Sequence, residues 1–248
     1  MNFLLLHEAE VDASGRALLR GRRAEHVRTV LRAQPGQVLR AGRVDGPLGR
    51  ATVRAIDAAG NVEVETEWHA PPPPTHDVLL LAVPRPKVLL RLFEHAAALG
   101  YRRLVLFRSW RVEKSHLQSS AMQPEVQREH LLAGLEQAGR TALPEVTFCP
   151  LFKPMVEDQL PGFGLPPTRF VAHPQATVRT SDLAALAGAP FALAIGPDGG
   201  FLPYEVDRLA ELGFLPVSCG DHPLRTETAV AVLTGQLALL RDCITVRP

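Results

Sequence analysis

The chain has 248 residues, a formal net charge of +1, 46% hydrophobic residues and three cysteines. This length allows one large or two moderate domains, and the apolar content excludes a disordered chain. No apolar run is long enough for a signal peptide or a membrane-spanning helix. Cys149, Cys219 and Cys243 are widely spaced and form no CxxC pair, which argues against a disulfide framework and a zinc site. We therefore expect a cytoplasmic protein without a metal centre.

The near-neutral total charge conceals two basic blocks. Between residues 16 and 54, ten arginines stand against Glu25 and Asp45, a net charge of +8. Between residues 85 and 114, eight basic residues stand against Glu94 and Glu113, a net charge of +6. Arginine pairs with phosphate through two parallel hydrogen bonds and also stacks on bases. The blocks favour a nucleic-acid partner, and a solvated charged face stays open as the alternative.

Short strands and one helix are expected in the first 70 residues. The helix covers residues 24–31, where Val27, Val30 and Leu31 follow helical spacing. Clusters of β-branched residues between turns rich in Gly, Asp and Asn predict the strands. These strands are expected at 3–6, 38–39, 51–56 and 62–66. Such a run of short strands predicts a small β-barrel domain over residues 1–70.

Four consecutive prolines follow at residues 71–74. They remove four backbone donors and force an extended, stiff conformation, which suits a spacer between domains. The sequence therefore predicts a linker at 71–76 and a second domain at 77–248.

After the prolines, buried strands alternate with helices. Residues 78–83 form an apolar run without alternation, typical of a strand buried on both faces of a parallel sheet. Alternating strands and helices predict an α/β domain with right-handed crossovers. The strands are expected at 78–83, 104–107, 170–172, 192–195 and 215–217, and the helices at 87–99, 127–137, 203–212 and 228–240.

A glycine-rich loop, GPDGG at 196–200, follows one of these strands and precedes a helix that Pro203 begins. Glycines let a backbone approach a ligand closely. The dinucleotide fingerprint and the phosphate-loop pattern are both absent. From these residues alone, a structural turn and a ligand-binding loop are equally good interpretations.

A second loop, CGDHPLRTETA at 219–229, leads into the last helix. Thr226 or Thr228 could cap this helix, and Glu227 suits its positive end. Arg225 is a cation at the helix end that disfavours cations. An anionic or polar ligand explains Arg225 better than helix formation does.

Together these motifs resemble the RsmE family of the SPOUT methyltransferases, which methylate N3 of a uridine in 16S ribosomal RNA. GPDGGF at 196–201 looks like the family's GPEGGF, and LRTETA at 224–229 matches its motif in full. Weaker similarities are the family's EQ-x-x-R stretch at 136–140, its H-x-x-x-VLR segment at 26–32 and AHP at 172–174. The resemblance covers nearly the whole chain in the family's order.

The resemblance implies a PUA-like RNA-binding β-barrel at the N-terminus and an α/β SPOUT domain with a deep trefoil knot. It also implies a homodimer, S-adenosylmethionine (SAM) as cofactor, and 16S rRNA or the assembled small ribosomal subunit as substrate. The residues implied to bind the cofactor lie in three loops and the last helix. They are His173, Gly196, Pro197, Asp198, Gly199, Gly200, Val217, Gly220, Leu224, Thr226 and Ala229.

The implied reaction needs a group that stabilises charge and a group that handles the N3 proton. Arg225 is expected to stabilise the developing charge, and Glu227 to orient it or to accept the proton. RNA contacts are expected from six arginines: Arg22, Arg28, Arg32, Arg108, Arg111 and Arg140. A same-fold methyltransferase with a different RNA target and a non-catalytic ribosome-assembly factor stay open as alternatives.

Four positions depart from the family pattern. Asp198 stands where Glu is usual, and Leu202 replaces the usual Ser or Thr, with Pro203 and Glu205 expected to compensate for the lost cap. Ala98 and Phe107 stand where acidic residues are common. These changes leave the expected cofactor site intact and bear on the RNA specificity.

Overall fold

The computed structural model describes residues 3–69, 76–186 and 188–242. By its contacts the chain splits into two compact units, residues 1–74 with 131–143 and residues 75–130 with 144–248. The sequence predicts a second domain that runs without interruption from 77 to 248, whereas the structure groups 131–143 with the first unit. Of the predicted linker at 71–76, only residue 76 lies within the described residues.

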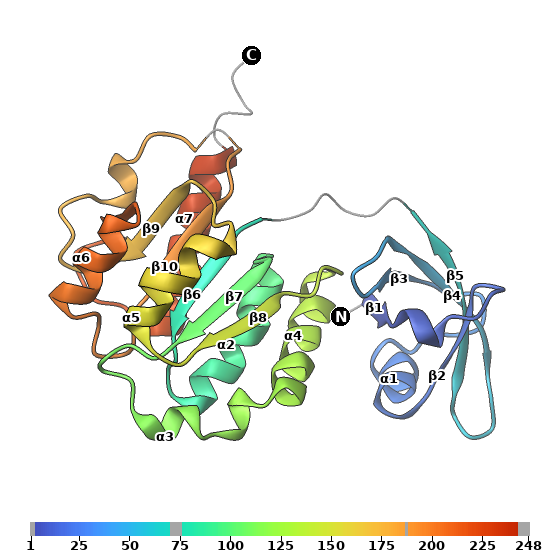
Figure 1. Cartoon of the computed structure of the whole chain (residues 1–248). Coiled ribbons are helices and arrows are strands. Elements are labelled where there is room, and N and C mark those ends of the chain that lie inside the picture. The colour runs from blue at the N-terminus through green and yellow to red at the C-terminus, as the bar shows by residue number, and fades with distance from the viewer. Residues whose placement is uncertain (1–2, 70–75, 187, 243–248) are drawn as a thin grey trace, which may run out of the picture. The chain divides into compact units, whose positions relative to one another are not determined.

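The first unit contains a five-stranded sheet with the order β1-β3-β4-β5-β2 (Figure 1). The strands β1 and β3 pair in parallel, and the other neighbours are antiparallel. The strands are β1 (Phe3–Leu6), β2 (Arg16–Leu19), β3 (Val38–Arg43), β4 (Leu48–Ile56) and β5 (Val62–Trp68). Four of the five were expected from the sequence, and β2 was not.

One helical segment covers the apolar face of this sheet. Helix α1 (Gly21–Glu25) continues into a π-helical turn, His26–Val30, where a single helix over 24–31 was expected. Ala24 and Val27 are buried in the core of the unit, together with residues of every strand. The apolar side of the segment therefore faces the sheet and leaves Arg22 and Arg28 toward solvent.

The second unit contains a six-stranded sheet with the order β11-β9-β10-β6-β7-β8. Every pair of neighbours is parallel, which confirms the α/β class. All residues of β6 and β10 are buried, as their continuous apolar sequences predict. The strands are β6 (Val78–Ala82), β7 (Arg103–Phe107), β8 (Glu145–Cys149), β9 (Thr168–Ala172), β10 (Phe191–Ile195) and β11 (Phe214–Val217).

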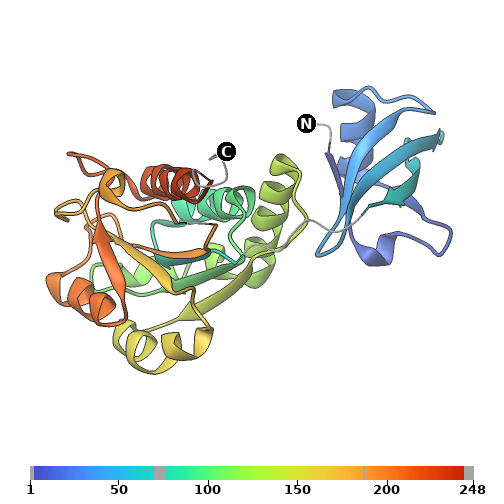
Figure 2. The same ribbon diagram turned by 90° about the horizontal axis from the view of Figure 1, so that it is seen from above.

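Helices cover both faces of this sheet (Figure 2). Helices α2 and α7 lie on one face, where the buried hydroxyls of Tyr101 and Thr234 are 2.5 Å apart, and α5 and α6 lie on the other. The remaining helix bounds are α2 (Pro86–Leu99), α3 (Lys114–Leu117), α4 (Pro124–Ala138), α5 (Phe152–Pro154), α6 (Pro203–Glu211) and α7 (Thr226–Asp242). Short 3-10 or π turns occupy Glu8–Glu10, Ser120–Met122, Met155–Gln159, Leu160–Phe163 and Thr180–Asp182.

The strands β11, β9 and β10 are neighbours at one end of the sheet, so their carboxyl ends lie side by side. The GPDGG loop at 196–200, the loop that begins near Cys219 and the AHP segment at 172–174 all begin at these three ends. The arrangement thus brings three separate stretches of sequence to one place. The trefoil knot and the PUA-like character of the first unit stay predictions.

Candidate functional site

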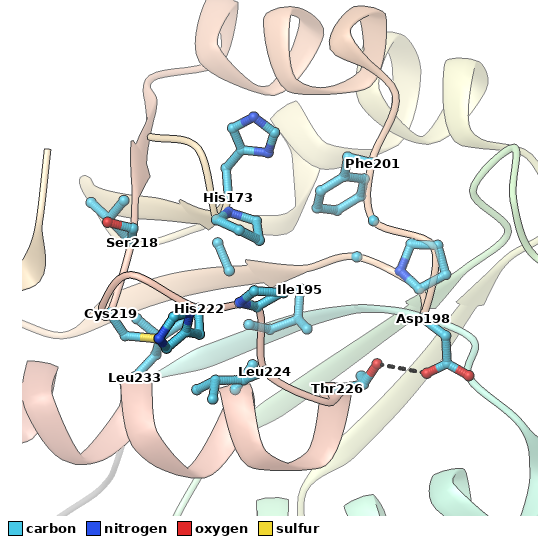
Figure 3. Close-up of a pocket in the computed structure, with 18 of the residues that line it drawn as sticks. His173, Ile195, Asp198, Phe201, Ser218, Cys219, His222, Leu224, Thr226 and Leu233 are labelled. Carbon is cyan, nitrogen blue, oxygen red and sulfur yellow. Dashed lines mark hydrogen bonds between the residues drawn. The ribbon is translucent and has the colours of Figure 1, made fainter. Parts of the chain in front are cut away.

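A pocket of about 220 Å³ lies where β9, β10 and β11 end (Figure 3). Its wall consists of residues 172–174, 195–201, 217–220 and 222–224, together with side chains from the first turns of α7. In open parallel sheets, ligands bind in the crevice outside the carboxyl ends of the strands. The pocket therefore occupies the position where an α/β domain binds small molecules.

All eleven residues that were predicted to bind the cofactor line this pocket. They are His173, Gly196, Pro197, Asp198, Gly199, Gly200, Val217, Gly220, Leu224, Thr226 and Ala229. The predicted set lacked nine further lining residues: Ala172, Pro174, Ile195, Phe201, Ser218, Cys219, His222, Pro223 and Leu233. Most of these are chain neighbours of predicted residues. Leu233 lies one helical turn after Ala229, so its position on the same face of the helix could have been inferred from the sequence.

Glycine leaves room for a ligand at two positions of the pocket wall. Gly200 has a φ of +72° in the left-handed region, and its N–H donates to the Pro197 carbonyl at 2.7 Å, which closes the turn. A Cβ atom at Gly200 or Gly220 would have no other atom within 4 Å. The backbone therefore faces open space in both loops. The apolar side chains of Ile195, Phe201 and Leu224 complete the wall.

Asp198 joins the glycine loop to two helices. The Thr226 hydroxyl donates to the Asp198 carboxylate at 3.1 Å, and Arg85 Nε lies 3.3 Å from the other carboxylate oxygen. Arg85 directly precedes α2, and Thr226 is the first residue of α7. The Asp side chain thus reaches both partners and ties the loop to the rest of the domain.

The expectation that Thr226 or Thr228 caps α7 is wrong. The helix begins at Thr226, whose hydroxyl bonds to Asp198, and the Ala229 N–H donates to the Arg225 carbonyl at 2.8 Å. Arg225 therefore holds the N-cap position.

The two predicted catalytic residues do not line the pocket. Arg225 is exposed and, within the described residues, has no carboxylate within 4 Å. Glu227 accepts a hydrogen bond from Arg91 Nη2 of α2 at 3.1 Å. Glu227 thereby ties the first turn of α7 to α2, directly after Thr226 of the pocket wall.

The loop after β7 also reaches the glycine loop, through Arg111. The Arg111 guanidinium donates to the Gly199 carbonyl, and a Cβ atom at Gly199 would lie 3.1 Å from Arg111 Cδ. A side chain at position 199 would therefore displace Arg111. Glycine at this position permits the close approach of the two loops.

Glu205, in the first turn of α6, is buried and accepts three hydrogen bonds. They come from the Leu202 N–H at 2.8 Å, the Trp110 N–H at 2.9 Å and the Ser109 hydroxyl at 3.2 Å. The bond to Leu202 satisfies a backbone donor at the start of the helix. This confirms that Glu205 compensates for the side-chain cap that Leu202 cannot supply.

The six arginines that were predicted to bind RNA are distributed over both units. Arg22, Arg28 and Arg32 are exposed along or just after the helical segment of the first unit. Arg140 is exposed in the part of the chain that follows α4 and belongs to the same unit. Arg108 and Arg111 follow β7 in the second unit. The roles of all six stay predictions.

Within the described residues, no helix is long and apolar enough to cross a membrane, and no group of three or more His, Cys, Asp or Glu side chains could hold a metal ion.

The solved structures most useful for comparison share the fold over nearly the whole chain. A ribosomal RNA small subunit methyltransferase E from Neisseria gonorrhoeae, bound to SAM, has a TM-score of 0.73 at 19% identity, with 98% of each chain covered. A methyltransferase from Legionella pneumophila in complex with SAM has a TM-score of 0.69 at 21% identity, with 98% of this chain and 97% of that chain covered. At these identities the likeness establishes the fold.

Sequence comparison establishes the family. Residues 71–238 match the model of the RNA methyltransferase domain. The ribosomal RNA small subunit methyltransferase E of Treponema pallidum is 30% identical, and the alignment covers 92% of this chain and 87% of that protein. The protein of the same name from Mycobacterium bovis is 28% identical, with 92% and 88% covered. The chain therefore belongs to the RNA methyltransferases, in the family of ribosomal RNA small subunit methyltransferase E.

Proposed function

We propose that this chain transfers a methyl group from SAM to N3 of a uridine in 16S ribosomal RNA. The observation that carries the proposal is the pocket at the ends of β9, β10 and β11, because it collects all eleven predicted cofactor residues in a chain of this family. The small-subunit RNA as substrate rests on the names of the relatives. The choice of uridine N3 rests on the family resemblance.

The pocket wall fits SAM in its chemistry. Backbone groups of the loops at 196–200 and 217–224 would hold the adenine and ribose, since glycines leave these backbones accessible. Ile195, Phe201 and Leu224 supply apolar surface for a planar ring. When bound, SAM supplies a methyl carbon whose bond to sulfur breaks, with the electron pair left on sulfur, as N3 forms its new bond.

Arg225 is the residue to which we assign stabilisation of the uracil. Neutral uracil carries a proton on N3, so removing it places negative charge on O2 and O4. Arg225 directly precedes α7 and has no acidic partner among the described residues, so its charge is available to a ligand. Glu227 already accepts a hydrogen bond from Arg91. We therefore propose that Glu227 orients the neighbouring Arg225 by holding the first turn of α7 against α2. The N3 proton then passes to solvent water and not to Glu227.

The first unit would hold the RNA. Its exposed arginines Arg22, Arg28 and Arg32 can pair with phosphates, and Arg140 can add a further contact. We propose that the substrate is 16S rRNA, free or in the assembled small subunit. The enzyme would act in the cytoplasm as a homodimer, as the family resemblance implies.

The test is methyl transfer with tritiated SAM to naked 16S rRNA and to purified small subunits, followed by primer extension. Methylation at N3 blocks pairing, so the product should stop reverse transcription at one uridine. Arg225→Ala should lower turnover at saturating SAM by about 100-fold, as loss of one charge-stabilising group does. Arg128→Ala, which removes another exposed arginine of the same unit, is the control and should leave turnover unchanged.

Other outcomes favour the alternatives. Transfer to a different RNA would indicate a same-fold enzyme with another target. Absence of SAM binding by calorimetry would indicate a non-catalytic ribosome-assembly factor. Undiminished turnover of Arg225→Ala would remove Arg225 from the reaction.

A further inference from the structure

A second cavity, of about 490 Å³, is lined by Leu202, Tyr204 and Glu205, which follow the glycine loop. The loop after β7, the segment around α5 and the start of α6 form its wall. No residue lines both this cavity and the pocket at the strand ends. We call it the Trp110 groove. Its wall includes Arg108, Trp110, Leu151, Lys153, Tyr204 and Glu205.

Large aromatic and apolar side chains of the groove are exposed to solvent. Trp110 is 80% exposed, Leu151 54% and Tyr204 50%. Trp and Tyr are amphipathic rings that usually bury most of their surface. A tryptophan left this exposed beside two further apolar groups marks a surface that binds something flat and partly apolar.

The charge of the groove favours an anionic occupant. Arg108 and Lys153 both line it, and within the part of the chain that the structure describes neither has a carboxylate within 4 Å. The acidic residue of the wall, Glu205, is buried and already accepts three hydrogen bonds. Arg108 and Lys153 are therefore available to a ligand, whereas the carboxylate of Glu205 is already hydrogen-bonded within the protein.

The same three hydrogen bonds hold Trp110 in place. Its backbone N–H is bonded to Glu205, while its ring points to solvent without burial. The neighbouring Ser109 is fully buried and bonded to the same carboxylate. A backbone fixed in this way keeps Trp110 at the groove wall, and at 80% exposure its ring has a face open for stacking.

The groove and the pocket are connected through the glycine loop. Arg111, next to Trp110, donates to the Gly199 carbonyl, and Leu202 of the groove wall directly follows Phe201 of the pocket wall. A strand of RNA with one nucleotide at the pocket could therefore place a neighbouring nucleotide at the groove.

We propose that the Trp110 groove binds one unpaired nucleotide of the RNA, next to the nucleotide that is methylated. The base stacks on Trp110 and Tyr204, and Arg108 and Lys153 contact its phosphate. This inference rests on the proposed function, because it names a second contact of the same RNA.

The binding test uses tryptophan fluorescence. The chain has two tryptophans, Trp68 and Trp110, so the variant Trp68→Phe reports on Trp110 alone. Hexauridylate should quench Trp110 emission, and an abasic ribose-phosphate hexamer of equal charge should not, because only the first offers bases to stack. If hexauridylate saturates the chain without quenching Trp110, the groove does not hold a base.

The kinetic test uses variants of the groove. Trp110→Ala and Tyr204→Ala should each raise the KM for small-subunit RNA by about tenfold, the scale of one base-stacking contact. Affinity for SAM should not change, and Trp110→Phe should keep most of the wild-type KM. Leu239→Ala is the matched control, since Leu239 is an exposed apolar residue of the same unit outside the groove.

Two outcomes would overturn the proposal and are distinct from failure of the proposed function. If the unaltered chain methylates RNA and Trp110→Ala has the same KM, the groove does not contact the substrate. If Trp110 is shielded from acrylamide before RNA is added and Trp110→Ala converts a dimer into monomers in sedimentation, the groove is a subunit interface. Absence of methyl transfer by the unaltered chain would instead contradict the proposed function itself.

Discussion

The pocket of the second unit and the helical segment of the first unit present different atoms to a ligand. Around the pocket, glycine backbones, short side chains and apolar groups form the wall, and Asp198 is its single acidic side chain. The helical segment at 21–30 instead directs the side chains of Arg22 and Arg28 to solvent while Ala24 and Val27 hold it against the sheet. One surface is defined by shape and the other by charge.

The two surfaces should therefore bind their ligands through different physical interactions. A pocket whose wall is mostly backbone selects its ligand by shape. Its affinity for the ligand should therefore depend weakly on salt and fall strongly when a substitution adds atoms to the wall. Phosphate contacts by arginine release counterions, so their affinity should fall steeply with salt. Each of the following experiments changes one of these surfaces and leaves the other intact.

The largest effect is expected from filling the pocket. Ala229 lines it from α7, and Ala229→Leu adds three carbons at that point with a good helix former. We expect the Kd for SAM to rise at least about 100-fold, or about 2.7 kcal/mol, with the thermal midpoint close to that of the wild type. Titration calorimetry measures the Kd.

Ala231→Leu is the matched control. Ala231 is exposed on the same helix and does not line the pocket, so its substitution should leave SAM binding unchanged. Equal SAM affinity in Ala229→Leu and Ala231→Leu would place the cofactor elsewhere.

The sequence predicted most of the fold, and the two strands that it missed share one cause. Both unexpected strands, β2 and β8, are edge strands, each with a single neighbour in its sheet. Short edge strands carry polar residues on exposed positions, as Arg16 and Glu145 do here. Their local pattern is therefore weak, because pairing with an inner strand holds them in place. The assignment of residues 131–143 to the first unit likewise depends on contacts that no local pattern carries.

The pocket could be predicted because its glycines stand in two recognisable motifs. The hydrogen bonds that Asp198 accepts from Thr226 and Glu205 accepts from Trp110 could not be predicted, since they join residues 28 and 95 positions apart. Such pairs follow from the order of the strands in the sheet. The sequence likewise carried no sign that Glu227 is paired with Arg91.

The next effect in size is expected from the charged surface. Reversing Arg22, Arg28 and Arg32 to Glu should reduce the slope of log K against log salt by about three, one per lost phosphate contact. Affinity for RNA at low salt should fall by roughly 30-fold, on the order of 0.7 kcal/mol per arginine. SAM affinity should not change. Filter binding at several salt concentrations measures both quantities.

Arg54→Glu serves as control for that experiment, because Arg54 lies in the same basic block but donates to Glu65 at 2.6 Å, whereas Arg22 lies 4.0 Å from Glu136. A slope that is the same in the triple variant and the wild type would show that the helical segment is only a solvated charged face.

A smaller effect is expected on cysteine reactivity. In a Cys243→Ser background, Cys219 lines the pocket and is partly exposed, whereas Cys149 is 1% exposed and burial raises the pKa of its thiol. Iodoacetamide should therefore label Cys219 and spare Cys149 in the folded protein. SAM at ten times its Kd should slow the labelling of Cys219 about tenfold by mass action. Mass spectrometry of digests reads both sites, and labelling of Cys219 at an unchanged rate would argue against SAM in this pocket.

The smallest effect concerns an arginine that serves the fold and not the RNA. The Arg23 guanidinium donates to Glu10, with one nitrogen 2.9 Å from the carboxylate, and the His7 N–H donates at 2.8 Å. The hydrogen bond from Arg23 is the main cause that lowers the pKa of Glu10 from its usual 4.5, against the opposing effect of burial. Because the folded pKa lies below the unfolded one, this contact stabilises the protein above about pH 4.5 and is lost as the pH falls through the folded pKa.

Glu10→Gln should therefore lower the free energy of unfolding by about 1 kcal/mol at pH 7 and by much less at pH 3. Urea unfolding in a Trp110→Phe background, followed by the fluorescence of Trp68, which packs against the core of the first unit, measures the difference. Glu8→Gln is the control, since Glu8 is 82% exposed and its pair with Arg43 should contribute little. A loss of equal size at both pH values would mean that the contact does not depend on charge. In that case only its burial, and not its ion pair with Glu10, would distinguish Arg23 from its exposed neighbours Arg22 and Arg28.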